Sequence, residues 1–201
     1  MSNERYLMRR LIDGLSGWLA YRQAAAAKKM YSEHFLYDPI SEIAKSRGWL
    51  VLPQQPIKRK LNSAGAPKTI DFAFVRKRTD DHGPGMVLLE VKYLKNANST
   101  LELRRLQEDI NKLSTTFPTH LDDLLNVAQY GKAKNFLLVA AQRENYRALL
   151  SVNSKTNSSV VMMLKKALAD NPPKSVYRTE IQTHLRDDQR WEVVCFGQTA
   201  W

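Results

Sequence analysis

Apolar side chains recur along the chain with two different periods, which separate predicted helices from predicted strands. Between residues 6 and 19 the apolar positions follow one another at steps of three and four, the spacing of one face of a helix. Residues 69–75 (TIDFAFV) and 86–94 (MVLLEVKYL) are instead dense in β-branched and large apolar side chains, and a turn-forming segment at 79–85 (TDDHGPG) separates them. This pattern is typical of two strands joined as a hairpin.

Taken over the whole chain, these patterns predict a mixed α/β fold. The predicted helices span residues 4–37, 40–46, 101–113, 121–130, 146–152 and 160–169, and the predicted strands span residues 49–52, 69–75, 86–94, 135–141, 176–185 and 191–196. Gly14 and Gly17 are expected to break the first helix into two pieces. Three successive strands have no helices between them, which excludes a doubly wound parallel sheet.

The length of 201 residues fits one domain. We expect a single domain over residues 1–201, with a helical N-terminal extension at 1–29. A core at 30–141 follows, with its elements in the order helix, strand, strand, strand, helix, strand. A C-terminal extension of helices and strands at 142–201 completes the predicted domain.

Cysteine content and hydropathy restrict the protein class. The one cysteine, Cys195, excludes an internal disulfide framework and a cysteine-rich zinc site. No apolar run approaches the roughly 20 residues that span a bilayer. Arg9 and Arg10 precede an apolar stretch that Asp13 interrupts, so no secretory signal is predicted. We therefore expect a soluble, cytoplasmic protein without membrane contact.

The charge balance points to an anionic partner. Lys and Arg total 31 against 20 acidic residues, which gives a formal net charge of +11 and a pI near 9.8. Such a chain is a candidate for nucleic-acid binding, because each neutralised phosphate releases a counterion. A charge spread evenly over the surface for solubility is the alternative, and the charge alone leaves both open.

Charged residues interrupt two otherwise apolar predicted strands. Glu90 and Lys92 are two residues apart, so they project from the same face of their strand. Asp71 interrupts the preceding strand, and a hairpin would bring it beside Glu90. Two converging carboxylates form the hard-oxygen environment that Mg²⁺ prefers. A surface salt bridge between Glu90 and Lys92, with Asp71 on an edge strand, is the alternative for each residue taken alone.

Asp71 and the Glu90-x-Lys92 pair, within this order of elements, resemble the PD-(D/E)XK nuclease superfamily over about residues 30–141. Ile70 stands where that family often has proline. The resemblance implies a restriction-endonuclease-like core and metal-dependent hydrolysis of phosphodiester bonds. It also implies that Asp71 and Glu90 hold Mg²⁺, with Mn²⁺ able to substitute, and that Lys92 positions the attacking water or stabilises the transition state.

The resemblance further implies a catalytic Glu on the first core helix, for which Glu33 and Glu42 are candidates. Glu33 shares the apolar face of Tyr37 and Ile40 at steps of three and four, whereas Glu42 falls on the polar face. An acid on an inward face is better explained by a metal site than by solvation, so Glu33 is favoured. Pro39 could kink the helix and reset this phase.

Asp109 and Lys112 in the next predicted helix are three residues apart. In similar families a charged residue of this helix approaches the active site, and Gln107 is a weaker candidate of the same kind. The preferred interpretation here is nevertheless a surface ion pair of a few tenths of a kcal/mol, because i,i+3 pairs of opposite charge are common on exposed helices.

Basic clusters flank the candidate site and could track a phosphate backbone. Solvated loops are an equally favoured interpretation of the same residues. The proposed nucleic-acid contacts are Lys58, Arg59, Lys60, Lys68, Arg76, Lys77 and Arg78.

Other common chemistries have no motif in the chain. The four histidines lack metal-ligand spacing, and there is no phosphate-binding loop of the NTPase type. We therefore expect a Mg²⁺-dependent nuclease, with DNA favoured over RNA as substrate. The alternative is a catalytically inactive nuclease-fold protein that binds nucleic acid or another protein. A homodimer or a partner protein is compatible with either function, and the sequence leaves the form of the substrate open.

Overall fold

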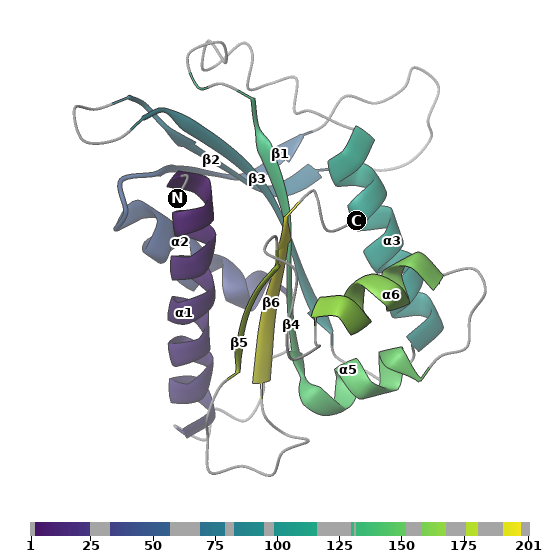
Figure 1. The fold of residues 1–201 in the computed structure, drawn as a ribbon. Helices are drawn as coiled ribbons and strands as arrows, with labels where there is room; N and C mark the ends of the chain where they lie inside the picture. The colour runs from purple at the N-terminus through teal and green to yellow at the C-terminus, as the bar shows by residue number, and fades with distance from the viewer. Residues whose placement is uncertain are drawn as a thin grey trace.

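The computed structural model describes residues 3–24, 33–56, 69–78, 83–94, 99–115, 130, 132–151, 158–167, 176–180 and 191–197. In these residues, one six-stranded sheet in the order β1-β2-β3-β4-β6-β5 forms the centre of the molecule (Figure 1). The strands are β1 (Leu50–Pro56), β2 (Thr69–Arg76), β3 (Gly85–Leu94), β4 (Lys134–Gln142), β5 (Val176–Glu180) and β6 (Trp191–Gly197). The helices are α1 (Asn3–Ala24), the 3₁₀-helix η1 (Glu33–Leu36), α2 (Tyr37–Lys45), α3 (Ser99–Thr115), α5 (Arg143–Leu150) and α6 (Ser158–Ala167).

The predicted mixed α/β fold is confirmed. Neighbouring strands are antiparallel except for β3 and β4, which run in parallel. A parallel pair requires a crossover connection, and α3 lies between these two strands in the chain. The predicted order of helix, strand, strand, strand, helix, strand is present as α2, β1, β2, β3, α3 and β4.

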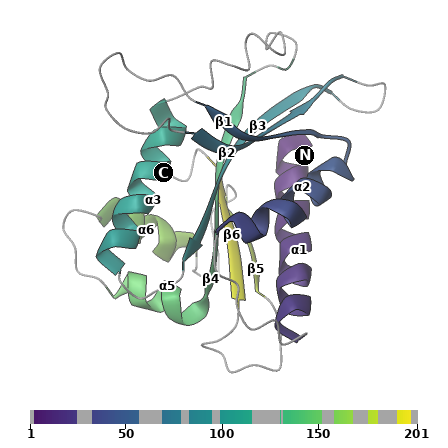
Figure 2. The same cartoon turned by 180° about the vertical axis from the view of Figure 1, so that it is seen from behind.

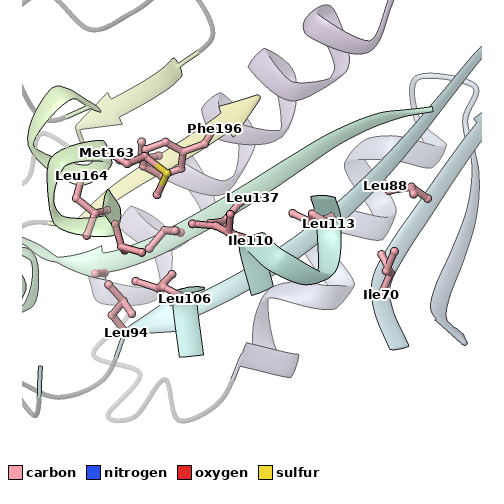
Figure 3. Packing of buried hydrophobic residues seen from close by; sticks show 14 of the residues in the cluster. Ile70, Leu88, Leu94, Leu106, Ile110, Leu113, Leu137, Met163, Leu164 and Phe196 are labelled. Carbon is pink, nitrogen blue, oxygen red and sulfur yellow. The ribbon is translucent and has the colours of Figure 1, made fainter. Parts of the chain in front are cut away.

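Helices cover both faces of the sheet, with α1 and α2 on one side and α3, α5 and α6 on the other (Figures 1 and 2). Within the predicted apolar stripe of α1, Leu7, Leu11, Leu15 and Leu19 are fully buried against the first face, whereas Tyr6 is exposed and Trp18 is partly buried. On the second face, α3 packs its apolar residues, Leu106 among them, over buried strand residues (Figure 3). The N-terminal extension therefore contributes directly to the hydrophobic core.

Two glycines in α1 do not break it, contrary to the prediction. The helix runs without interruption through Gly14 and Gly17. A Cβ on Gly14 would lie 2.6 Å from Cδ1 of Ile43, which is closer than packed atoms approach. Gly14 thus serves the close approach of α1 to α2 and does not mark a boundary.

Several helices and strands begin or end at other residues than predicted. The strand expected at residues 49–52 extends as β1 to Pro56, because prolines are tolerated on an edge strand. The helix expected at 40–46 begins earlier, at Tyr37. Of the helix predicted at 121–130, residues 121–129 lie outside the described residues, and Tyr130 is in a turn.

None of the helices in the described part of the chain is both long enough and apolar enough to cross a membrane.

Candidate active site

The β2–β3 hairpin brings Asp71 and Glu90 together. Phe72 pairs with Leu89, so the next position along the hairpin sets Asp71 opposite Glu90. The strand pairing ends at Phe72 and Leu89, and just beyond it Asp71 Oδ2 accepts a hydrogen bond from the backbone N–H of Val91 at 2.8 Å. The side chain of Asp71 thus occupies the space where the two strands stop pairing.

Three donors fix the Asp71 carboxylate. Besides the Val91 N–H on Oδ2, Oδ1 accepts from the Tyr37 hydroxyl at 2.5 Å and from Gln54 Nε2 at 3.2 Å. Gln54 also donates to the Tyr37 hydroxyl at 2.9 Å, and Thr69 Oγ1 donates to Gln54 Oε1 at 2.9 Å. These contacts from α2, β1 and β3 leave the carboxylate little freedom to rotate.

Glu90 is almost fully buried, with 2% of its surface exposed. Its Oε2 lies 2.6 Å from Lys112 Nζ of α3, and the same ammonium donates to the backbone carbonyl of Thr69 at 2.9 Å. Its other oxygen, Oε1, is buried with no hydrogen-bond partner among the described residues. A buried carboxylate oxygen without a partner is costly, and a bound cation or water would remove that cost.

Lys92 lies between two more carboxylates. Its Nζ is 3.6 Å from Glu33 Oε2 of η1 and 3.6 Å from Asp109 Oδ2 of α3. Asp109 Oδ1 is in turn 3.6 Å from Lys112 Nζ. The four acids and two lysines of this group, Glu33, Asp71, Glu90, Asp109, Lys92 and Lys112, are called the carboxylate–lysine cluster below.

The cluster holds more acid than base. Four carboxylates face two ammonium groups, so two negative charges are in excess when all are ionised. Burial raises the pKa of Glu90 to about 9, with help from the Asp71 charge and against the opposing charge of Lys112. Burial likewise raises the pKa values of Glu33 and Asp109, although Lys92 opposes both shifts.

The pKa of Lys112 is also raised. Burial alone lowers it, but the charges of Glu90, Asp109 and Asp71 together outweigh burial and raise it above its ordinary value. Lys112 therefore stays charged and is the built-in counter-ion of Glu90 when that carboxylate is ionised.

The structure separates the two candidates for the helix acid. Glu33 joins the carboxylate–lysine cluster, whereas Glu42 is exposed and its Oε1 accepts from Lys45 at 3.2 Å. Pro39 lies in the first turn of α2, where proline is tolerated, and Glu33 precedes that helix in η1.

The preferred interpretation of Asp109 and Lys112 was wrong. The two residues do form the predicted i,i+3 ion pair, but the pair is not on an exposed surface. Side-chain exposure is 18% for Asp109 and 16% for Lys112, and both side chains contact the strand residues of the cluster. Gln107, the weaker candidate, donates to Asn111 one turn along α3.

Two further residues were missed by the sequence argument. Tyr37 carried a signal, because it shares the inward helical face of Glu33. Gln54 carried none, since it follows the predicted end of its strand at Leu52. Its backbone φ of 52° lies in the left-handed region, which costs a residue other than glycine about 1 kcal/mol or more.

The predicted nucleic-acid contacts fall into three groups. Lys77 and Arg78 are exposed. Arg76 is only 8% exposed, and its guanidinium lies over the Trp49 ring at 4.7 Å from the centroid. The remaining predicted contacts, Lys58, Arg59, Lys60 and Lys68, lie outside the described residues.

The described residues contain no group of three or more His, Cys, Asp and Glu side chains arranged to hold a metal ion. A smaller donor set nevertheless fits one. Asp71 and Glu90 supply carboxylate oxygens, the ligands that Mg²⁺ prefers. The unpartnered Oε1 of Glu90 and the excess negative charge of the cluster both favour a divalent cation at this place.

The chain matches no family model, no curated protein and no solved structure.

Proposed function

We propose that the protein is a Mg²⁺-dependent nuclease that hydrolyses phosphodiester bonds. The observation that carries the proposal is the carboxylate–lysine cluster, in which Asp71, Glu90 and Lys92 meet on two paired strands with Glu33 beside them. The order of α2, β1, β2, β3, α3 and β4 supports a restriction-endonuclease-like core. DNA is proposed as the substrate in preference to RNA.

Asp71 and Glu90 would hold the metal ion. When bound there, Mg²⁺ neutralises charge on the scissile phosphate and lowers the pKa of water. The chain's own part is to preorganise the ligands. Tyr37, Gln54 and the Val91 N–H hold Asp71 in one orientation, and the hairpin register sets Glu90 opposite Asp71.

Lys92 is the residue proposed to act on the reacting phosphate. Its ammonium is held by Glu33 and Asp109 at 3.6 Å each, distances that leave room for a further hydrogen bond. A fixed cation in a partly buried site stabilises charge that develops in the transition state, because no solvent reorganisation is needed. Lys112 instead lies 2.6 Å from Glu90 and is proposed to position that carboxylate.

A cleavage assay tests the proposal. Supercoiled plasmid, linear duplex, single-stranded DNA and RNA are incubated with the protein in Mg²⁺, Mn²⁺ or EDTA. Metal-dependent cutting by the wild type, lost in Lys92→Met and retained in Glu42→Gln, is the expected result. Glu42 is the matched control, because it is an exposed carboxylate on the helix that follows Glu33. Cutting that persists in EDTA would falsify the proposal.

One contact favours the alternative, an inactive nuclease-fold protein that binds nucleic acid or a protein partner. Lys112 Nζ lies 2.6 Å from Glu90 Oε2, so a protein cation already neutralises one of the two candidate metal ligands. The same assay decides between the two functions. Salt-sensitive binding of nucleic acid without cleavage in either metal would favour the binding protein.

A further inference from the structure

A second charged region lies at the opposite end of the β2–β3 hairpin. β2 ends at Arg76 opposite Gly85, where β3 begins. β4 begins there as well, with Lys134 beside Val87, and the turn before β1 lies there because Leu50 pairs with Val75. The chain segments that meet are residues 46–48, 76–78 and 132–134.

These three segments are basic and contain no acidic residue. Their cations form what we call the sheet-end basic surface: Arg47, Arg76, Lys77, Arg78, Lys132 and Lys134. All of them except Arg76 are exposed. The one acid found in contact with them among the described residues is Glu4 of α1, whose Oε2 lies 2.8 Å from Lys134 Nζ.

The surface is hollowed. A cavity of about 330 Å³ is lined by Arg47, Arg76 and Lys77, together with Gly48, Leu50, Val75 and Tyr130. Every charged residue of this lining is a cation. A concave site with two or three converging cations is suited to a phosphate group, which accepts several hydrogen bonds at once.

The cavity and the carboxylate–lysine cluster lie at different positions along the β2–β3 hairpin. Gly85 and Glu90 are five residues apart on β3, which separates the two regions by roughly 17 Å along the strand. The strand residues between the two regions, Ala73 and Leu88 among them, are buried in the core, so the two regions are separate surfaces. A B-form duplex that contacted both would span about five base pairs between them.

We propose that the sheet-end basic surface binds the phosphate backbone of a nucleic acid at a distance from the carboxylate–lysine cluster. The inference rests on the proposed function for the identity of the ligand, but not on catalysis. An anionic membrane is less well matched, because binding at a membrane surface needs an apolar face beside the cations. Of the large apolar side chains exposed in the described residues, only Leu50 borders the cavity.

Binding is measured first, by fluorescence anisotropy of labelled DNA in EDTA with the full chain. The probes are a duplex of about 20 base pairs, roughly 70 Å long, and the corresponding single strand. The test variant is Arg47→Gln with Lys77→Gln, two exposed residues whose loss spares the core. The control is Lys165→Gln with Lys166→Gln, which removes the same charge from the exposed part of α6.

The test variant should bind more weakly and with less salt dependence. Each lost phosphate contact should flatten the slope of log K against log salt by about 0.9 for duplex and about 0.7 for single strands. The control should retain the wild-type slope. Equal losses in both variants would overturn the inference, since net charge alone would then explain binding. Displacement of the duplex by anionic phospholipid vesicles at equal phosphate concentration would also overturn it.

Cleavage in Mg²⁺ separates the inference from the proposed function. In the test variant, KM should rise while kcat stays at the wild-type value, because the cluster is untouched. If no variant cleaves but the binding difference persists, the nuclease proposal fails and the phosphate surface stands. If all variants cleave and bind alike, the phosphate surface fails and the nuclease stands.

Discussion

At one end of the β2–β3 hairpin, Asp71, Glu90 and Lys92 are held among partners of both signs, and burial raises the pKa of Glu90 to about 9. At the other end, Lys77 and Arg78 stand exposed, and Arg76 alone turns inward onto Trp49. Charges removed from water need fixed partners, so they carry preorganised geometry. Exposed charges need no fixed partners within the protein, so they carry less preorganised geometry and act through attraction to a ligand.

The largest effect is expected from Asp71→Asn at the buried end. The substitution keeps the shape of the side chain but removes a charged metal ligand and replaces one of its two acceptor oxygens, which serve three donors, with an NH₂ group. Cleavage should fall about a thousandfold or more, equal to at least ~4 kcal/mol of transition-state stabilisation. Single-turnover rates in Mg²⁺ measure the loss, and circular dichroism checks the fold. Cleavage at the wild-type rate by a folded variant would contradict the role of Asp71.

Lys92→Met tests the buried cation at the same end. The methionine keeps the length of the side chain and removes the charge held between Glu33 and Asp109. The rate of the chemical step should drop about 10²–10³-fold, the usual result of deleting one preorganised charge-stabilising group. Binding of DNA in EDTA should change little. A large loss of binding with a small loss of rate would instead make Lys92 a substrate contact.

Tyr37→Phe tests the support of Asp71. The variant loses the hydroxyl that donates to Asp71 Oδ1 and accepts from Gln54, while its ring still packs on Phe72. Outer contacts of this kind typically contribute 10–100-fold to metal affinity, so Mn²⁺ binding followed by calorimetry should weaken by about that factor. Tyr21→Phe on the exposed side of α1 is the control. Unchanged Mn²⁺ affinity would make Tyr37 a packing residue only.

Much of the charged end of the hairpin that holds Asp71, Glu90 and Lys92 could be predicted from the sequence. The two-residue spacing of Glu90 and Lys92 sets them on one face whatever the tertiary structure, and the TDDHGPG turn predicts the hairpin that brings Asp71 to them. The helical period selected Glu33 over Glu42. The two-residue period survives in β3. Glu33 joins the cluster as predicted, although it lies in the 3₁₀-helix η1 before α2 and the 3.6-residue period does not extend to it.

Residues whose surroundings come from distant segments were not predictable in this way. Asp109 and Lys112 form an i,i+3 pair in any helix, and only the placement of α3 over β3 turns that pair inward. Gln54 reaches Asp71 because β1 continues past Pro53 with a left-handed residue. Arg76 belongs to a basic run, yet it is buried because Trp49 lies beneath it.

The pH dependence of stability sharpens the contrast further. The pKa of Glu90 is about 9 in the folded protein and near 4.3 in an unfolded chain. Between these two pH values the folded protein keeps a proton on Glu90 that the unfolded chain has released. The resulting contribution to the free energy of unfolding is complete below about pH 4 and is lost as the pH rises through about 9. Metal-free wild type should be less stable at pH 9 than at pH 6 in urea denaturation.

Glu90→Gln should reduce the loss of unfolding free energy between pH 6 and pH 9 by about 1–3 kcal/mol, because it removes the group that loses its proton. Glu33 and Asp109 also have raised pKa values, so part of the decrease in stability with rising pH should remain. Equal slopes for the variant and the wild type would show that Glu90 is ionised throughout, balanced by Lys112.

The smallest effect is expected from Arg76→Met, the counterpart of Lys92→Met at the basic end. Burial lowers the pKa of Arg76 against the opposing charge of Glu4, so desolvation offsets much of what its charge contributes. A methionine keeps the contact with the Trp49 ring through its thioether. The free energy of unfolding should thus change by less than ~1 kcal/mol, and the rate of the chemical step at saturating substrate should not change. A rate loss as large as that of Lys92→Met would show that a buried cation at either end serves catalysis, and the contrast between the two ends would fail.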